Sequence, residues 1–228
     1  MNGLPHDRGP IYLETVMGRF PVEPWNTASN LLFLGLIIFW TWRLRRDGIG
    51  PHRLIAGALP VLFIGWVGGT IYHATRSANI WLFLDIGPIA LLVVATAVFF
   101  WRRVGLAWFW ILLVVLGPTV LVMGAMSTLG LPRVMGPMIG YPMMAVSLLL
   151  PLLWNLRREG GADLGLVLAA LAVFVFAVLS RSFDARLSAD LLPMGTHWLW
   201  HSLGAGAVQL LITYIWRSDL RQATQISR

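Results

Sequence analysis

The chain has 228 residues, of which 57% are hydrophobic and 12% charged, and its mean hydropathy is +0.74. This composition excludes an ordinary soluble globular domain of the same length. The absence of cysteine excludes disulfides and thiolate metal ligands, and the net charge of +7, carried by arginine without any lysine, gives no reason to expect a nucleic-acid partner.

Seven apolar segments follow a polar N-terminal segment, residues 1–26, which we expect to lie outside the membrane. Windows of about 20 residues place them at roughly 27–44, 54–75, 80–101, 105–126, 136–155, 163–180 and 195–216. These runs are too long and too uniformly apolar for the alternating strands of a membrane barrel. We therefore predict an all-α fold, a single domain built as a seven-transmembrane helix bundle.

The arginines divide unequally between the two surfaces of this predicted bundle. Of the 17, eleven fall on one side, whereas the other side holds only Arg8, Arg19, Arg76, Arg133, Arg181 and Arg186. The positive-inside rule then predicts that the N-terminus lies outside and the C-terminus in the cytoplasm. We expect a multi-pass integral membrane protein of a bacterial inner membrane, and the sequence indicates no protein partner.

Three of the five histidines fall within, or at the edge of, the apolar segments. His197 and His201 are four residues apart, so on a helix both rings lie on one face, at the spacing that two ligands of one metal ion need. His73 ends the second segment, and Asp85 lies just inside the third. In the predicted topology all four residues lie in the outer part of the bilayer. Because burying a histidine in the bilayer costs free energy, its presence there indicates a function, which these residues could share.

Three neutral imidazoles with one open coordination position are typical of a catalytic zinc site. Asp85 is the only acidic residue deep within an apolar segment, and it is our candidate for a general base, or for an acceptor that orients a zinc ligand. Taken singly, His73 could instead be an interfacial hydrogen-bonding residue, and Asp85 a buried polar partner.

The N-terminal segment carries a second group of polar residues just before the first apolar segment. Asn26, Ser29 or Asn30 can cap the first helix, and Glu23 suits the positive end of its dipole. Alternatively, Glu14, Glu23 and Asn26 are oxygen donors of the kind that calcium prefers. The residues alone leave both interpretations open.

Three short blocks of the sequence resemble motifs of the alkaline ceramidase family. The blocks are Glu23–Asn30 (EPWNTASN), Gly68–His73 (GGTIYH) followed by Asp85, and His197–His201 (HWLWH). The superfamily also holds the adiponectin and progestin receptor-like proteins and a group of lipid-remodelling factors. The resemblance extends over the whole seven-helix layout.

This resemblance implies an activity and a set of metal ligands. His73, His197 and His201 would bind zinc, and Asp85 would assist the water that attacks the substrate. The reaction would be hydrolysis of the amide bond of ceramide, or of a related N-acyl lipid within the bilayer, and it would release a fatty acid and an amine.

The resemblance also implies a calcium site in the N-terminal segment. Its ligands would be Glu23 and carbonyl groups beside Asn26, with Tyr12 and Glu14 as further candidates. Zinc and calcium are thus the two cofactors that we expect.

One position departs from the family pattern. The family has serine four residues before the first histidine, where this chain has Gly69. The neighbouring Thr70 is a candidate catalytic hydroxyl that could hold the oxyanion, although on a helix its side chain points about 100° away from the direction of position 69. The missing serine favours an alternative function, a lipid-responsive receptor-like or lipid-remodelling protein with a structural zinc site. A third function, a metal or proton transporter, is disfavoured because the inner half of the bundle shows no acidic relay.

Overall fold

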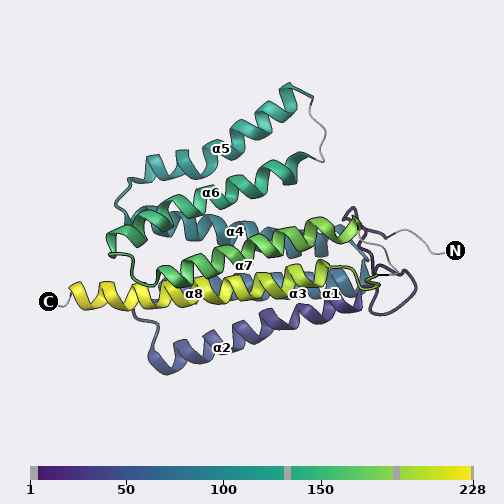
Figure 1. The fold of residues 1–228 in the computed structure, drawn as a ribbon, viewed down its shortest axis with the longest axis horizontal. Coiled ribbons are helices and arrows are strands. Elements are labelled where there is room, and N and C mark those ends of the chain that lie inside the picture. The colour runs from purple at the N-terminus through teal and green to yellow at the C-terminus, as the bar shows by residue number, and fades with distance from the viewer. Residues whose placement is uncertain (1–4, 131–134, 187–190, 227–228) are drawn as a thin grey trace. The chain divides into compact units, whose positions relative to one another are not determined.

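The computed structural model describes residues 5–130, 135–186 and 191–226, and every regular element in these ranges is a helix. The elements, shown in Figure 1, are α1 (Pro24–Ser29), α2 (Leu31–Asp47), α3 (Arg53–Thr75), α4 (Asn79–Arg103), α5 (Trp108–Thr128), α6 (Met135–Arg158), α7 (Leu164–Phe183), the 3₁₀ turn η1 (Asp184–Arg186) and α8 (His197–Ile226). The predicted all-α class is confirmed for this part of the chain.

Each predicted apolar segment coincides with helical structure, with two differences. The first segment is divided at Asn30, so that the short α1 precedes α2. The last helix, α8, continues to Ile226, beyond the predicted end at residue 216, because its final turns are polar and do not register in a hydropathy window. Pro60 and Pro88 lie inside α3 and α4 without ending either helix.

Five helical stretches in the described ranges are long and apolar enough to cross a membrane. They are Pro24–Asp47, Arg53–Thr75, Asn79–Arg103, Trp108–Thr128 and Leu164–Phe183. This finding supports a multi-pass membrane protein. The number of seven spans and the orientation of the termini stay predictions.

The chain divides into two units, each with its own internal contacts. The first unit combines the chain up to Ile89 with the chain from Asp163 onward, and the second is Ala90–Ala162. In the first unit α7 packs along α8, α2 packs on α3 and α8, and α1 contacts both α3 and α8. In the second unit α5 packs beside α6. The prediction of a single domain is not tested by this division.

Small residues allow α3 and the beginning of α4 to approach closely within the first unit. A Cβ atom at Gly68 would collide with the backbone of Leu84, and one at Gly65 would lie 3.1 Å from Cβ of Pro88. Glycines at such positions let helix backbones meet in membranes. The contact brings Asp85 on α4 beside the last turns of α3.

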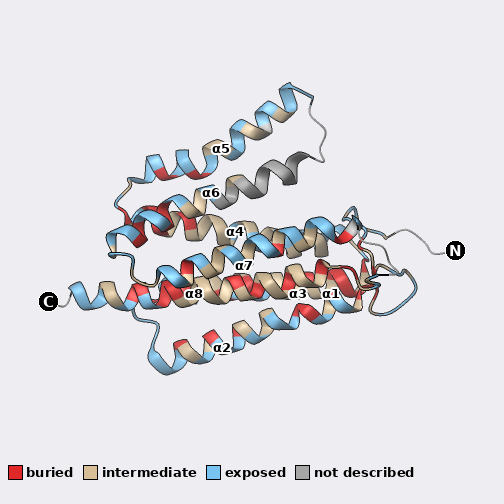
Figure 2. Ribbon diagram, in the orientation of Figure 1, coloured by how far each residue is buried: buried red, intermediate tan, exposed pale blue. Residues whose placement is uncertain are grey.

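Buried residues gather at one end of the first unit, where α1, the end of α3 and the start of α8 meet (Figure 2), and many of them are polar. At the other end of α3 and α8, the Nδ1 atom of His52 lies 2.9 Å from Oδ2 of Asp219. The His52 ring stacks on the Trp216 ring, with centroids 3.5 Å apart. The His52–Asp219 contact therefore ties the beginning of α3 to the last part of α8.

An ion-pair network also joins α7 to α8. Asp163, just before α7, accepts hydrogen bonds from Arg217 at 2.7 Å and from Arg221 at 2.5 Å. Its backbone is left-handed, with φ 63°. Although burial of the carboxyl group acts in the opposite direction, the hydrogen bonds and charges of Arg221 and Arg217 lower the pKa of Asp163.

Asp163→Asn tests this network, because asparagine has nearly the same size and tolerates the left-handed conformation. A carboxyl group whose pKa is lowered by folding stabilises the protein above its unfolded-state pKa, and the contribution is lost as the pH falls through the folded-state pKa. We expect the substitution to lower the free energy of unfolding by about 0.2–1 kcal/mol at neutral pH, since both arginines are partly exposed. Below the folded-state pKa the two proteins should be equally stable. Thermal unfolding of both proteins in detergent, at neutral pH and below the folded-state pKa of Asp163, measures the difference in stability. An equal difference at the two pH values would contradict the prediction.

Candidate metal centre

Three buried imidazole rings meet at the polar end of the first unit. His73 comes from the last turn of α3, and His197 and His201 come from the first two turns of α8. One ring nitrogen from each lies within 4.8 Å of the other two, and the three residues are 0%, 1% and 4% exposed. The predicted convergence of these histidines is confirmed, and they lie close enough together to bind one metal ion.

Two of the rings are held by hydrogen bonds at their Nδ1 atoms. Nδ1 of His73 lies 2.5 Å from the carboxylate of Glu23. Nδ1 of His201 lies 3.1 Å from the carbonyl oxygen of Asn26 and 2.9 Å from the hydroxyl of Ser29. Because a carboxylate and a carbonyl can only accept, we assign the proton of each ring to Nδ1, which leaves Nε2 with its lone pair for a metal.

Three buried ring nitrogens have no hydrogen-bond partner within the described residues. They are Nε2 of His73 and both nitrogens of His197. A buried polar atom without a partner costs free energy, and an ion between the rings would supply a partner to Nε2 of His73 and to one of the two nitrogens of His197. Three imidazoles without thiolates suit zinc among the common protein metals. The site therefore fits the predicted zinc ion, while the identity of the metal stays a proposal.

His197 is fixed by contacts on two sides. The Asp184 carboxylate accepts the backbone N–H groups of Thr196 at 2.6 Å and His197 at 2.9 Å, which caps the start of α8. The same carboxylate accepts the N–H of Leu13 at 3.0 Å. The ring of Tyr12 stacks on the His197 ring, with centroids 3.8 Å apart. The N-terminal segment therefore packs directly against this histidine.

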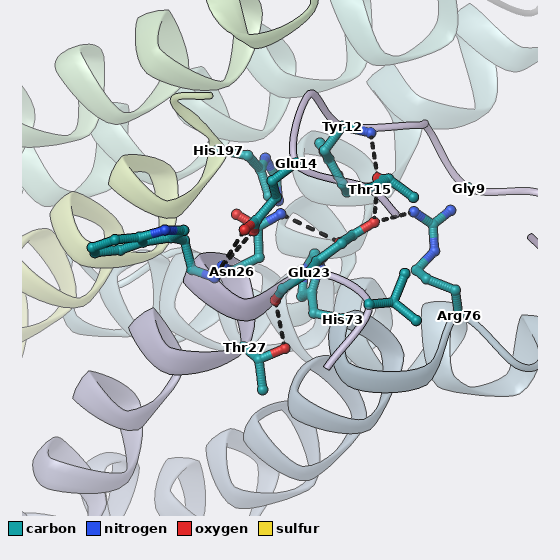
Figure 3. A network of polar contacts seen from close by, with 12 residues as sticks. Gly9, Tyr12, Glu14, Thr15, Glu23, Asn26, Thr27, His73, Arg76 and His197 are labelled. Atoms are coloured by element: carbon teal, nitrogen blue, oxygen red, sulfur yellow. Dashed lines mark hydrogen bonds and ion pairs between the residues drawn. The ribbon is translucent and has the colours of Figure 1, made fainter. Parts of the chain in front are cut away.

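Glu23 connects the N-terminal segment to the metal centre (Figure 3). Its carboxylate accepts hydrogen bonds from Thr15, Asn26, His73 and Arg76, and its side chain is fully buried. Although burial raises the pKa, the hydrogen bond from His73 and the charge of Arg76 together lower the pKa of Glu23. This carboxylate is thus an ionised anchor for the His73 ring.

The residues predicted to bind calcium have other partners. Glu14 accepts the backbone N–H groups of Trp25 at 2.9 Å and Asn26 at 2.7 Å, and the pKa of Glu14 is raised by burial. The Glu23 carboxylate is filled by its four donors, and the Tyr12 ring packs on a histidine. Asn26 Oδ1 is buried without a donor in the described residues. Since calcium takes six to eight oxygen ligands, this arrangement does not fit it.

Asp85 and Thr70, the predicted catalytic residues, lie on the two helices that meet at glycine contacts. A Cβ atom at Gly69 would collide with Oδ1 of Asp85, so the glycine leaves the space that this carboxylate uses. Because Gly69 precedes His73 by about one helical turn, this contact places Asp85 near the metal centre. The Thr70 hydroxyl is buried without a hydrogen-bond partner in the described residues. Their catalytic roles stay predictions.

Several residues of the site were not predicted from the sequence. Arg76 was predicted only as one of the arginines at the membrane surface, no role was predicted for Asp7 or Asp184, and Ser29 was predicted as a possible helix cap rather than a partner of His201. For Arg76 one signal was available, an arginine three residues after a candidate ligand and directly after the end of an apolar segment.

Glu23→Gln should weaken zinc binding, because glutamine keeps the shape of the side chain but removes the charge that orients His73. Loss of such an outer partner typically lowers metal affinity about 10- to 100-fold. Competition with a chromophoric chelator measures the affinity. Asp47→Asn is the matched control, since Asp47 pairs with exposed arginines at the end of α2. Equal zinc affinity in wild type and Glu23→Gln would rule out the anchoring role.

The comparisons with known proteins add no family assignment. No protein-family model matches the chain, and no curated protein matches it significantly.

Proposed function

We propose that the chain is a zinc-dependent intramembrane hydrolase that cleaves the amide bond of ceramide or a related N-acyl lipid. The observation that carries the proposal is the convergence of His73, His197 and His201 in a chain with five helices able to span a membrane. The proposal includes the seven-span topology, with the site toward the outer surface of a bacterial inner membrane.

The residues around the three histidines suit amide hydrolysis. A zinc ion with three imidazole ligands and one open position supplies a Lewis acid that polarises a carbonyl and lowers the pKa of water. Asp85 is the carboxylate that can take a proton from the attacking water and deliver it to the departing amine. Thr70, whose hydroxyl lacks a partner in the described residues, can donate a hydrogen bond to the developing oxyanion.

The exposed apolar surface of α4 at the depth of Asp85 supports the proposal of a lipid substrate. Ile80, Phe83 and Ile86 on the same turns of α4 are exposed, Phe83 to 66%. An apolar helix surface of this kind, in a segment long enough to cross a membrane, faces hydrocarbon rather than water. An acyl chain lying against it would bring its amide group to the level of Asp85.

One observation favours a second candidate function. The three histidines are almost completely buried, and closed sites of this kind also occur where zinc is structural. In that case the chain would be a lipid-responsive receptor-like or lipid-remodelling membrane protein, and bound lipid would stay intact.

The decisive experiment uses the purified protein in detergent with a fluorescent N-acyl sphingoid lipid. We expect zinc-dependent release of fatty acid, which is lost after chelation and in His197→Ala. Asp85→Asn should keep its zinc and lose about 10²- to 10⁴-fold in kcat, as expected for removal of a general base. Zinc bound to wild type with the lipid left intact would reject hydrolysis in favour of a structural metal.

Gly69→Ala tests the position of Asp85 without changing any polar group. The added methyl group would collide with the Asp85 carboxylate and displace it. Because a misplacement of about 1 Å can cost about 100-fold in rate, we expect a loss of that order in kcat with zinc still bound. Gly35→Ala on α2 is the matched control, since a Cβ there meets no atom within 4 Å. Unchanged kcat in Gly69→Ala would show that this contact does not position Asp85.

A further inference from the structure

Arg76 is a fully buried guanidinium group that the proposed reaction does not use. Its Nε and Nη2 atoms each donate to the carboxylate of Asp7 at 2.8 Å, and its Nη1 atom donates to Glu23. The side chains of all three residues are 0% exposed. Its guanidinium carbon lies 4.7 Å from the centre of the Tyr72 ring. The group therefore has a fixed position between two carboxylates.

The backbone at this position favours glycine. Arg76 ends α3 with φ 49° and ψ 35°, the left-handed conformation that residues with a side chain rarely adopt. Helices commonly end with glycine in this conformation. The left-handed backbone at Arg76 costs free energy, and the side chain is completely buried. The interactions of the guanidinium group must therefore contribute more free energy than the backbone conformation costs.

The charges show what is stabilised. Asp7 and Glu23 are two buried carboxylates on either side of one buried cation. Although desolvation favours the neutral form, the hydrogen bonds that Arg76 donates to Asp7 and the charge of Glu23 raise the pKa of Arg76, which therefore stays charged. Without the guanidinium, both carboxylates would be buried without a cation, a state that proteins avoid by protonation or by binding a metal.

We propose that Arg76 is a built-in cation, which replaces a divalent metal ion between Asp7 and Glu23 and, through Glu23, positions His73 in the metal centre. The four residues form one continuous chain of hydrogen bonds from Asp7 to the His73 ring. The fork of Nε and Nη2 on Asp7 fixes the plane of the guanidinium group, so that Nη1 donates to one oxygen of the Glu23 carboxylate while the other oxygen accepts Nδ1–H of His73. Arg76 is thus a positioning residue, which acts on the metal ligand through Glu23.

This inference explains why the oxygen-rich N-terminal segment does not fit calcium. Glu23 already faces a cation, and that cation belongs to the chain. It follows that wild-type zinc affinity should not depend on added calcium. Removal of the guanidinium should create a cation site that did not exist before.

Arg76→Gly provides the sharpest test, because glycine removes the guanidinium and at the same time relieves the left-handed backbone. A residue that served only to end the helix would be replaced without loss, or with a gain in stability. We expect zinc affinity to fall about 10- to 100-fold, the usual effect of losing a partner beyond the ligands. Added calcium or guanidinium chloride at low concentration should restore part of the zinc affinity and raise the unfolding temperature of this variant alone. Arg8→Gly is the control, since Arg8 is exposed and its backbone N–H, not its side chain, bonds Asn79.

Arg76→Lys covers the case in which the glycine variant does not fold, as judged by its circular dichroism. Lysine keeps the charge but cannot make the fork, so zinc affinity should lie below that of wild type. Wild-type zinc affinity in either variant, or calcium-dependent zinc affinity in wild type, would overturn the proposal.

The inference rests on the metal centre and not on lipid hydrolysis. A wild-type protein that binds zinc but cleaves no lipid would remove the proposed function and leave this proposal standing. If instead the lipid is cleaved while Arg76→Gly binds zinc like wild type, only this proposal fails.

Discussion

The Glu23 carboxylate is the contact on which the polar end of the molecule depends. A buried carboxylate is stable only when its oxygens are filled by donors, and here the donors come from three separate parts of the chain: the N-terminal segment, α1 and α3. Satisfying this one group therefore fixes the ring of His73, the start of α1 and the course of the segment before it. The position of a metal ligand inside a helix bundle thus depends on residues outside the apolar spans.

Long apolar runs made the helices predictable, and the same physics explains the differences. A stretch that must satisfy its backbone hydrogen bonds in hydrocarbon has to be helical, so composition alone places α3, α4 and α7 to within a few residues. The break at Asn30 escapes such an average, because it lies in one continuous apolar stretch and involves a single residue. The close packing of α3 on α4 depends on glycines of α3, and the sequence does not show which helix lies opposite them.

The histidines of the site were predictable, and the groups that hold them were not. Spacing on a helix reveals His197 and His201 as a pair, and the cost of burying imidazoles in a membrane points to His73 as their partner. Arg76 looks like any other arginine at a membrane surface in a charge count. The role of Arg76 depends on its left-handed backbone and on the N-terminal segment, which folds back to cover the guanidinium group. The contact with Asp7, for example, joins residues 69 positions apart. Sequence patterns of short period carry no information on such pairs.

A metal ion bound by the three histidines would be coupled, through the same contacts, to the packing of the N-terminal segment. Tyr12 stacks on His197, Glu23 holds His73, and the carbonyl oxygen of Asn26 holds His201, so each of the three histidines has at least one partner from the chain before α2. If the segment detached, every ring would lose a contact that orients it, and the metal would bind more weakly. By linkage, a bound ion must hold the segment in place with the same free energy. A cover of this kind agrees with the proposal that a lipid substrate approaches along the exposed apolar surface of α4.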